Sequence, residues 1–197
     1  MSMRESDPLT GEPLALDLVN TRPAVHESRA DLIDSPRRLA VWLSREADRL
    51  PGDVRGGVPE AADLAAVHAV RAHTEVVVRA LLDHTEPPVA ALRGLTEAQR
   101  AAPSVRELAW DGAAVTAAPR RTGPLGVRLA AVLAEAAADL LTAPAIGKIK
   151  ECEADDCVML FLPSHPRRRW CSPTRCGNRA RVARYYQRHK PAAEPGG

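Results

Sequence analysis

CEADDCVMLFLPSHPRRRWCSPTRC, residues 152–176, contains every cysteine of the 197-residue chain. The four cysteines form two pairs, each with four residues between its members, and thirteen residues separate the pairs. Four thiolates at such spacings match the tetrahedral preference of Zn²⁺, because each pair can chelate from one tight turn. The spacing therefore predicts one structural zinc site, whose ligands are Cys152, Cys157, Cys171 and Cys176.

Two other uses of the cysteines compete with zinc: two disulfides, or free redox thiols. The N-terminal segment 1–10 is polar and lacks the apolar run of a secretory signal, so we expect a cytoplasmic protein in a reducing compartment, where clustered cysteines more often bind metal. His165 lies between the pairs and could replace one sulfur, but four cysteines already complete the shell. A shell of four thiolates also leaves no open coordination position, which favours a structural over a catalytic metal.

Composition predicts a mainly helical protein. Apolar residues make up 45% of the chain and aromatic residues only 3%, so Ala, Leu and Val must build the core. No apolar stretch approaches the length of about 20 residues that a membrane span needs. We expect three parts: a helical domain with one small β-hairpin, a treble-clef-like zinc finger, and a disordered tail, at residues 1–148, 149–190 and 191–197.

Hydrophobic periodicity and turn signals predict the elements of the helical domain. Ser35 is a candidate helix cap before Pro36, and Leu39, Trp42 and Leu43 then recur at helical spacing. Periodicity does not decide whether residues 12–20 form a helix or a strand. The turn dipeptide Asp111-Gly112 predicts a β-hairpin over residues 105–117. The predicted helices cover residues 36–50, 59–83, 88–101 and 125–142.

Within the finger, we expect Val158–Leu162 to pair with Arg168–Trp170 as a hairpin, and a helix to start near Gly177. Burial alone cannot fold such a small module, so zinc must supply the folding free energy. No flexible linker precedes Cys152, which predicts that the finger docks on the helical domain.

Basic residues are concentrated in the finger. Residues 157–193 contain nine Lys or Arg and no acidic residue, although the whole chain carries a net charge of only +2. An uninterrupted run of one sign is typical of nucleic-acid binding. At about 100° per residue counted from Arg179, Arg184, Arg188 and Arg181 fall at about 140°, 180° and 200° and form one stripe.

The opposite face of this predicted helix carries Val182, Ala183 and Tyr186, which we expect to pack on the finger's hairpin and the helical domain. Arg179 falls in the middle of this apolar face. We therefore expect Arg179 to bond loop carbonyls near the metal and not to contact DNA.

The chain resembles a known pair of domains. Trp170-Cys171-Ser172 and Cys176-Gly177-Asn178-Arg179, behind the first cysteine pair, are similar to the CGNR zinc finger. The upstream segments resemble the ABATE domain, through Leu16–Thr21 (LDLVNT), Trp42-Leu43, Asp111-Gly112 and Ala138–Leu141 (ADLL). Phe161–Pro166 is shorter than the corresponding family loop, and Pro173 stands where methionine is common. The resemblance implies a stress-related bacterial transcription regulator whose finger binds DNA.

We therefore expect a transcription regulator that binds DNA through the basic helix of its zinc finger. The helical domain would sense a small apolar effector or form a homodimer, and Asn20, Thr21, Arg22 and Trp42 are the groups to inspect for a pocket. The alternative is a zinc-stabilised module that binds protein or RNA. No catalytic motif is present, so we do not expect an enzyme. A DNA-binding protein of this kind would be associated with the nucleoid.

Two sets of residues follow from this expectation. Those expected to contact nucleic acid are Arg168, Arg175, Arg181, Arg184, Arg188 and Lys190. Those expected to support the zinc site are Trp170, Gly177, Asn178 and Arg179.

Overall fold

The computed structural model describes residues 10–25 and 28–189, so that Lys190 and the tail 191–197 lie outside the described residues. The prediction of a mainly helical chain is confirmed. The helices are α1 (Leu14–Val19), α2 (Pro36–Arg45), α3 (Ala61–Leu82), α4 (Val89–Ala101), α5 (Leu125–Thr142) and α6 (Asn178–His189). Single helical turns occur at η1 (Ala47–Arg49), η2 (Ile146–Lys148) and η3 (Pro173–Gly177).

The strands of the described residues form three antiparallel pairs. The pairs are β1 (Ala24–Val25) with β2 (Ser28–Arg29), β3 (Val105–Trp110) with β4 (Val115–Arg120), and β5 (Lys150–Glu151) with β6 (Leu160–Phe161). Residues 12–20, which periodicity left undecided, contain the short helix α1.

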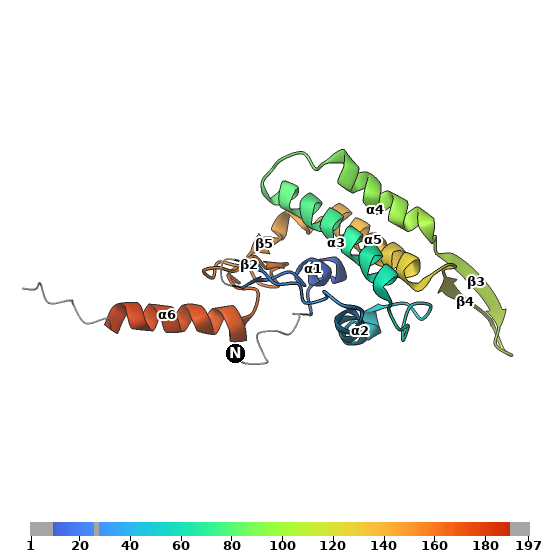
Figure 1. Cartoon of the computed structure of the whole chain (residues 1–197), viewed down its shortest axis with the longest axis horizontal. Coiled ribbons are helices and arrows are strands. Elements are labelled where there is room, and N and C mark those ends of the chain that lie inside the picture. The colour runs from blue at the N-terminus through green and yellow to red at the C-terminus, as the bar shows by residue number, and fades with distance from the viewer. Residues whose placement is uncertain (1–9, 26–27, 190–197) are drawn as a thin grey trace, which may run out of the picture.

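Three helices, α3, α4 and α5, pack against one another, while α1 contacts α3 and α5, and α2 contacts α3 (Figure 1). The predicted cap of α2 is present: the Ser35 hydroxyl accepts a hydrogen bond from the backbone N–H of Arg38, and Pro36 occupies the first turn. Trp42 is fully buried in a core made otherwise of aliphatic side chains. Among the described residues, no helix has both the length and the apolar content to span a membrane.

Close contact between α3 and α5 depends on Gly126. Its backbone N–H donates a 2.6 Å hydrogen bond to the Asp63 carboxylate, and a Cβ at residue 126 would lie 2.5 Å from the Asp63 Cα. Because that neighbour is backbone, it cannot swing away as a flexible side chain would. The small residue therefore sets the distance between the two longest helices.

Gly126→Ala should destabilise the protein by about 1–3 kcal/mol, since the helices must move apart to admit a methyl group. Gly147→Ala is the matched control, because a Cβ there would meet nothing within 4 Å. Chemical denaturation of both variants measures the difference. Equal stabilities would contradict the assigned role of Gly126.

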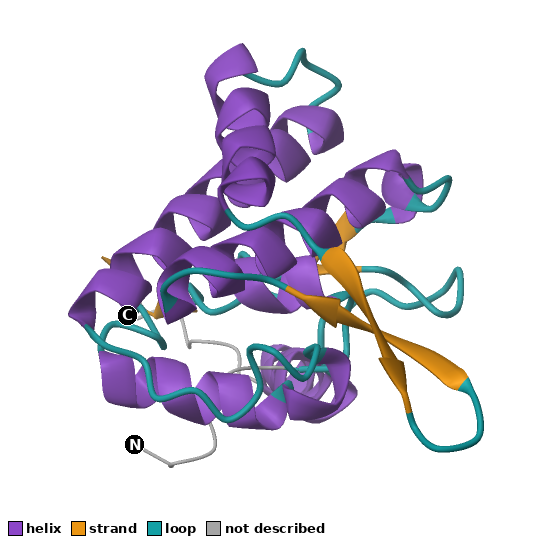
Figure 2. Cartoon of the chain, turned by 90° about the vertical axis from the view of Figure 1, so that its right-hand side faces the viewer, coloured by secondary structure: helices purple, strands orange, loops and turns teal. Residues whose placement is uncertain are grey.

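The predicted hairpin is confirmed and is longer than expected, because β4 continues to Arg120. Figure 2 shows β3 and β4 projecting from the helical layer as a twisted arm. At its tip, the Asp111 carboxylate accepts hydrogen bonds from the backbone N–H groups of Ala113 and Ala114, and Gly112 adopts φ +103°. A left-handed φ of this kind favours glycine, which explains the Asp-Gly turn signal.

Candidate metal centre and basic helix

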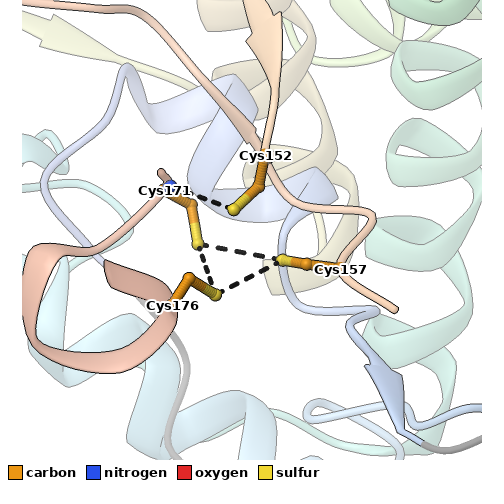
Figure 3. A group of neighbouring side chains, drawn as sticks. All are labelled: Cys152, Cys157, Cys171 and Cys176. Atoms are coloured by element: carbon orange, nitrogen blue, oxygen red, sulfur yellow. Dashed lines mark hydrogen bonds between the residues drawn. The ribbon is translucent and has the colours of Figure 1, made fainter. Parts of the chain in front are cut away.

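The four cysteine sulfurs converge at one point, as Figure 3 shows, and all lie within 4.8 Å of one another. The Sγ atom of Cys171 is 3.9 Å from that of Cys157 and 3.5 Å from that of Cys176, and the Cys176–Cys157 distance is 3.7 Å. A tetrahedral ion with bonds of about 2.3 Å to sulfur requires separations of about 3.8 Å. These distances fit a metal shell and exceed the S–S bond length of about 2.05 Å in a disulfide. The chain therefore presents four sulfurs positioned to bind a metal ion.

Backbone hydrogen bonds hold the two cysteine turns. Cys152 follows β5 directly, and its N–H donates to the Met159 carbonyl at 2.9 Å. The N–H of Cys171 donates to the Cys152 sulfur at 3.3 Å, which joins the two pairs. The second pair is closed by Ser172, whose hydroxyl accepts from the backbone N–H of Arg175 and whose carbonyl accepts from that of Gly177. The sulfurs are thus brought together by turns that the protein itself stabilises.

The expected hairpin within the finger is wrong in its pairing. Leu160 and Phe161 of β6 pair with Glu151 and Lys150 of β5, and not with residues 168–170. Arg169 instead accepts a 3.0 Å hydrogen bond at its carbonyl from the N–H of Glu153, in the first cysteine turn. Pairing with β5 is favoured because β5 leads straight from the helical domain, and the loop 162–167 is left to carry its prolines outside a strand.

Hydrogen bonds among the sulfurs shift the cysteine pKa values in opposite directions. Hydrogen bonding to the Cys152 sulfur raises the pKa of Cys157 and of Cys171 well above the ordinary range, and the same bonds lower the pKa of Cys152. Because a metal ion needs thiolates, its binding must release protons.

Cys176→Ser should abolish stoichiometric metal binding, since three sulfurs cannot complete the shell. His165→Ala should retain one metal ion per chain, because His165 is exposed and lies outside the cluster of sulfurs. Elemental analysis of the purified full-length variants measures both. Loss of metal from the His165 variant would show that the ligand set is assigned incorrectly.

The finger docks on the helical domain through a buried amide, as the absence of a linker predicted. The Asn20 side chain donates to the Leu160 carbonyl at 2.8 Å and accepts from the Leu160 N–H at 2.9 Å. Asn20 is only 2% exposed, and the Leu160 side chain lies within the core of the helical domain. One side chain at the end of α1 therefore satisfies both backbone groups of a finger residue. The only sequence signal for it was a polar residue ending the apolar segment 12–20.

Glu12 makes a second docking contact. Its carboxylate accepts from the Leu162 N–H at 2.9 Å and pairs with Arg168 at 2.6 Å. Arg79 on α3 adds a third contact by donating to the Val158 carbonyl at 3.2 Å. The sequence did not identify Glu12 or Arg79 as contacts of the finger, because their partners lie about 80 to 150 residues away.

Asn20→Ala should lower the free energy of unfolding by about 1–3 kcal/mol, because both backbone groups of Leu160 would be buried without partners. Hydrogen exchange in residues 150–162 should accelerate more than in α5. Gln99→Ala serves as the control, since this amide lies on α4 and donates to the Leu95 carbonyl of the same helix. The docking role would be refuted if finger exchange were unchanged in the Asn20 variant.

Arg168, which is expected to contact nucleic acid, makes several contacts within the protein. Its guanidinium donates to the carbonyls of Trp170 and Cys171 at 3.1 and 2.6 Å and lies 4.4 Å from the Phe161 ring centroid. Together with the Glu12 pair, these contacts engage the side chain within the protein. Arg168 therefore links the finger to Glu12 of the helical domain, and its contact with nucleic acid stays a prediction.

The residues expected to support the metal site surround the second cysteine pair. Arg179 donates to the Asp155 carbonyl at 3.2 Å and lies 3.6 Å from the Cys176 sulfur, so it links the two cysteine turns. Gly177 is buried, and Trp170 is half-buried beside it. Asn178 is the exposed first residue of α6.

The expected packing of α6 on the finger's hairpin and the helical domain is wrong. Val182 and Tyr186 are 54% and 68% exposed, and α6 makes its main contact with the preceding turn η3 (Figure 1). Ala183 is half-buried and lines a hollow of about 310 Å³ beside Trp170. Helical periodicity predicted which residues of α6 lie on the same face. It could not show whether another part of the chain packs against that face.

The remaining basic residues differ in their accessibility. Arg181, Arg184 and Arg188 are all exposed on α6, and the Arg184 guanidinium lies 5.8 Å from the Trp170 ring centroid. Arg175 is half-buried in η3. The structure thus exposes three arginines on the projecting helix.

The four side chains to inspect for an effector pocket are buried or paired within the protein. Thr21 and Trp42 are fully buried in the interior, and Asn20 is used in docking. Arg22 pairs with Glu75 at 3.8 Å. These side chains fill or bridge the helical domain, and effector binding stays a prediction.

Comparisons with protein families find two matching models, one over the helical domain and one over the region that contains the four cysteines. A family model named ABATE, described as "Putative stress-induced transcription regulator", matches residues 12–144. A second model, described as "CGNR zinc finger", matches residues 148–189. No curated protein matches the chain.

Proposed function

Because the chain belongs to the ABATE family and continues into a CGNR zinc finger, we propose that it regulates transcription by binding duplex DNA through α6. The observation that carries this proposal is the position of α6. The helix extends from the metal centre into solvent, and its twelve residues contain four arginines and no acidic residue. A helix of this size can enter the DNA major groove.

Charge on α6 favours a phosphate-rich partner. Arg181, Arg184 and Arg188 are exposed, whereas the acidic side chains near the finger are placed on the first cysteine turn. Glu153 on this turn is already engaged with Arg169 at 2.5 Å, and Glu151 at the end of β5 pairs with Arg79 at 3.4 Å. Arg181, Arg184 and Arg188 have no acidic partner among the described residues, which leaves them available to phosphates.

The proposed metal is Zn²⁺, and its role is structural. Four sulfurs would fill a tetrahedral shell, so no coordination position would remain for a substrate, and the proposal includes no catalytic step. Cys176 lies within η3, directly before α6. Bound zinc would fix this turn and thereby the direction in which α6 projects.

RNA is the competing ligand, and one observation favours it. Tyr185 and Tyr186 are 59% and 68% exposed, and Tyr185 stacks on His189 with ring centroids 4.2 Å apart. Exposed aromatic rings can stack on unpaired bases, as in proteins that bind single-stranded RNA. The greater number of cations on α6 leads us to favour duplex DNA.

Replacing Arg181, Arg184 and Arg188 together by Ala should weaken binding to duplex DNA about 100-fold or more at low salt. For the wild type, about three neutralised phosphates predict a slope of about −3 for log affinity against log salt concentration, and the variant's slope should approach zero. Fluorescence anisotropy on the zinc-loaded full chain, with duplex DNA and single-stranded RNA compared, measures both quantities.

A control with the same change in net charge is available on the helical domain. Arg37, Arg93 and Arg100 are exposed, and their triple replacement by Ala should leave the slope near −3. The proposal fails if both triple variants bind equally well, or if the wild type retains no duplex DNA at low salt. Tighter binding to single-stranded RNA than to duplex DNA would support the RNA alternative.

A further inference from the structure

The hairpin β3–β4 presents an apolar face that nothing in the described part of the chain covers. Leu108, Trp110 and Val115 are 70%, 66% and 69% exposed. Trp110 pairs directly with Val115, and Leu108 pairs with Ala117. Because side chains alternate along a strand, these four residues share one face. An aromatic and two large aliphatic side chains thus form a contiguous exposed patch.

The opposite face of the same hairpin is suited to water. There, Glu107 pairs with Arg120 at 3.0 Å, and the Thr116 hydroxyl donates to the Ala109 carbonyl at 3.2 Å. A strand pair with one polar and one apolar face normally buries the apolar face. An isolated two-stranded hairpin is also only marginally stable in water. The contrast between the two faces therefore indicates that the apolar face is covered by another surface.

We propose that this apolar face binds the same face of a second copy of the chain, with the two hairpins antiparallel across a two-fold axis. Such a contact is self-complementary, because each copy supplies both the patch and its cover. The strands of the pair are equally long, at six residues each, so an antiparallel copy can match the full length of the patch.

Charges at the two ends of the hairpin select the antiparallel orientation. Arg106 lies at the base, on the apolar face, and Asp111 lies at the tip. Hydrogen bonds from the backbone N–H groups of Ala114 and Ala113 lower the pKa of Asp111, which keeps it an anion at neutral pH. In the antiparallel arrangement the base of each hairpin, with Arg106, lies against the tip of the other, whose turn carries Asp111, whereas a parallel arrangement would bring like-charged ends together.

The available area fits a reversible dimer. The apolar face and its edges offer roughly 600 Å² per copy, given that one covered aromatic side chain contributes about 150–250 Å². Two copies would bury roughly 1,200 Å², which is the lower end of the range for specific interfaces. We therefore expect a dissociation constant in the micromolar range, about 1–50 μM.

The dimer would leave both basic helices free. Figure 1 shows the hairpin and α6 at opposite ends of the long axis, so contact between hairpins would direct the two α6 helices outward. A dimer of this kind could hold two DNA segments. Dimerisation and DNA binding use separate surfaces, so failure of one proposal leaves the other standing.

Two valines provide a matched test, because they differ in face but not in type or exposure. Val115 lies on the apolar face at 69% exposure, and Val105 lies on the polar face at 62%. Val115→Lys should raise the dimer dissociation constant at least tenfold, whereas Val105→Lys should leave it within about twofold. Arg106→Glu should also weaken the dimer, since it would lie against the tip of the other hairpin, whose turn carries Asp111. Sedimentation equilibrium of the full chain over about 1–200 μM gives the dissociation constants.

Circular dichroism melting confirms that each variant is folded, which is expected because both valines are exposed. The proposal is overturned if the wild type is monomeric at every concentration. It is also overturned if Val115→Lys dimerises like the wild type, or if both lysine variants weaken the dimer equally. The last two results would mean that another surface, or no particular face of the hairpin, holds the copies together.

Discussion

The convergence of four sulfurs within 4.8 Å is the constraint from which the C-terminal part of the structure follows. A bound cation would fix each cysteine turn relative to the other through bonds of about 2.3 Å. The second turn contains Cys176 and passes directly into α6. The direction of the projecting helix therefore depends on this turn, which a bound metal ion would hold in place.

The finger is also held in place by contacts between Leu160 and the helical domain. Asn20 satisfies both backbone groups of Leu160 in a buried environment, and Leu160 belongs to the core of the helical domain. A buried amide with two well-formed hydrogen bonds adds little net stability to the fold. Its loss costs free energy, because the buried backbone groups are then left without partners. It therefore specifies one docked arrangement. Docking turns two domains into a single elongated particle, with a basic helix at one end and the hairpin at the other (Figure 1).

Two exposed surfaces in the described part of the chain differ from each other in chemistry. Helix α6 is basic and mixed with aromatic residues, which suits a polyanion. The hairpin is apolar on one face, which suits a protein surface of the same kind. Within the described residues, both surfaces lie outside the helical core. In that core, side chains such as Trp42 and Thr21 are fully buried.

The sequence by itself determined the local and covalent features: the ligand set, the helix α5 at residues 125–142, the cap at Ser35 and the hairpin around Asp111-Gly112. These depend on spacing, periodicity and turn chemistry, which act over a few residues. Only the tertiary structure decided that β6 pairs with β5, that Arg168 pairs with Glu12, and that Val182 and Tyr186 of α6 stay exposed. The physical reason is that an arginine or an apolar stripe looks the same in sequence whether its partner is water, a carboxylate 156 residues away or another molecule.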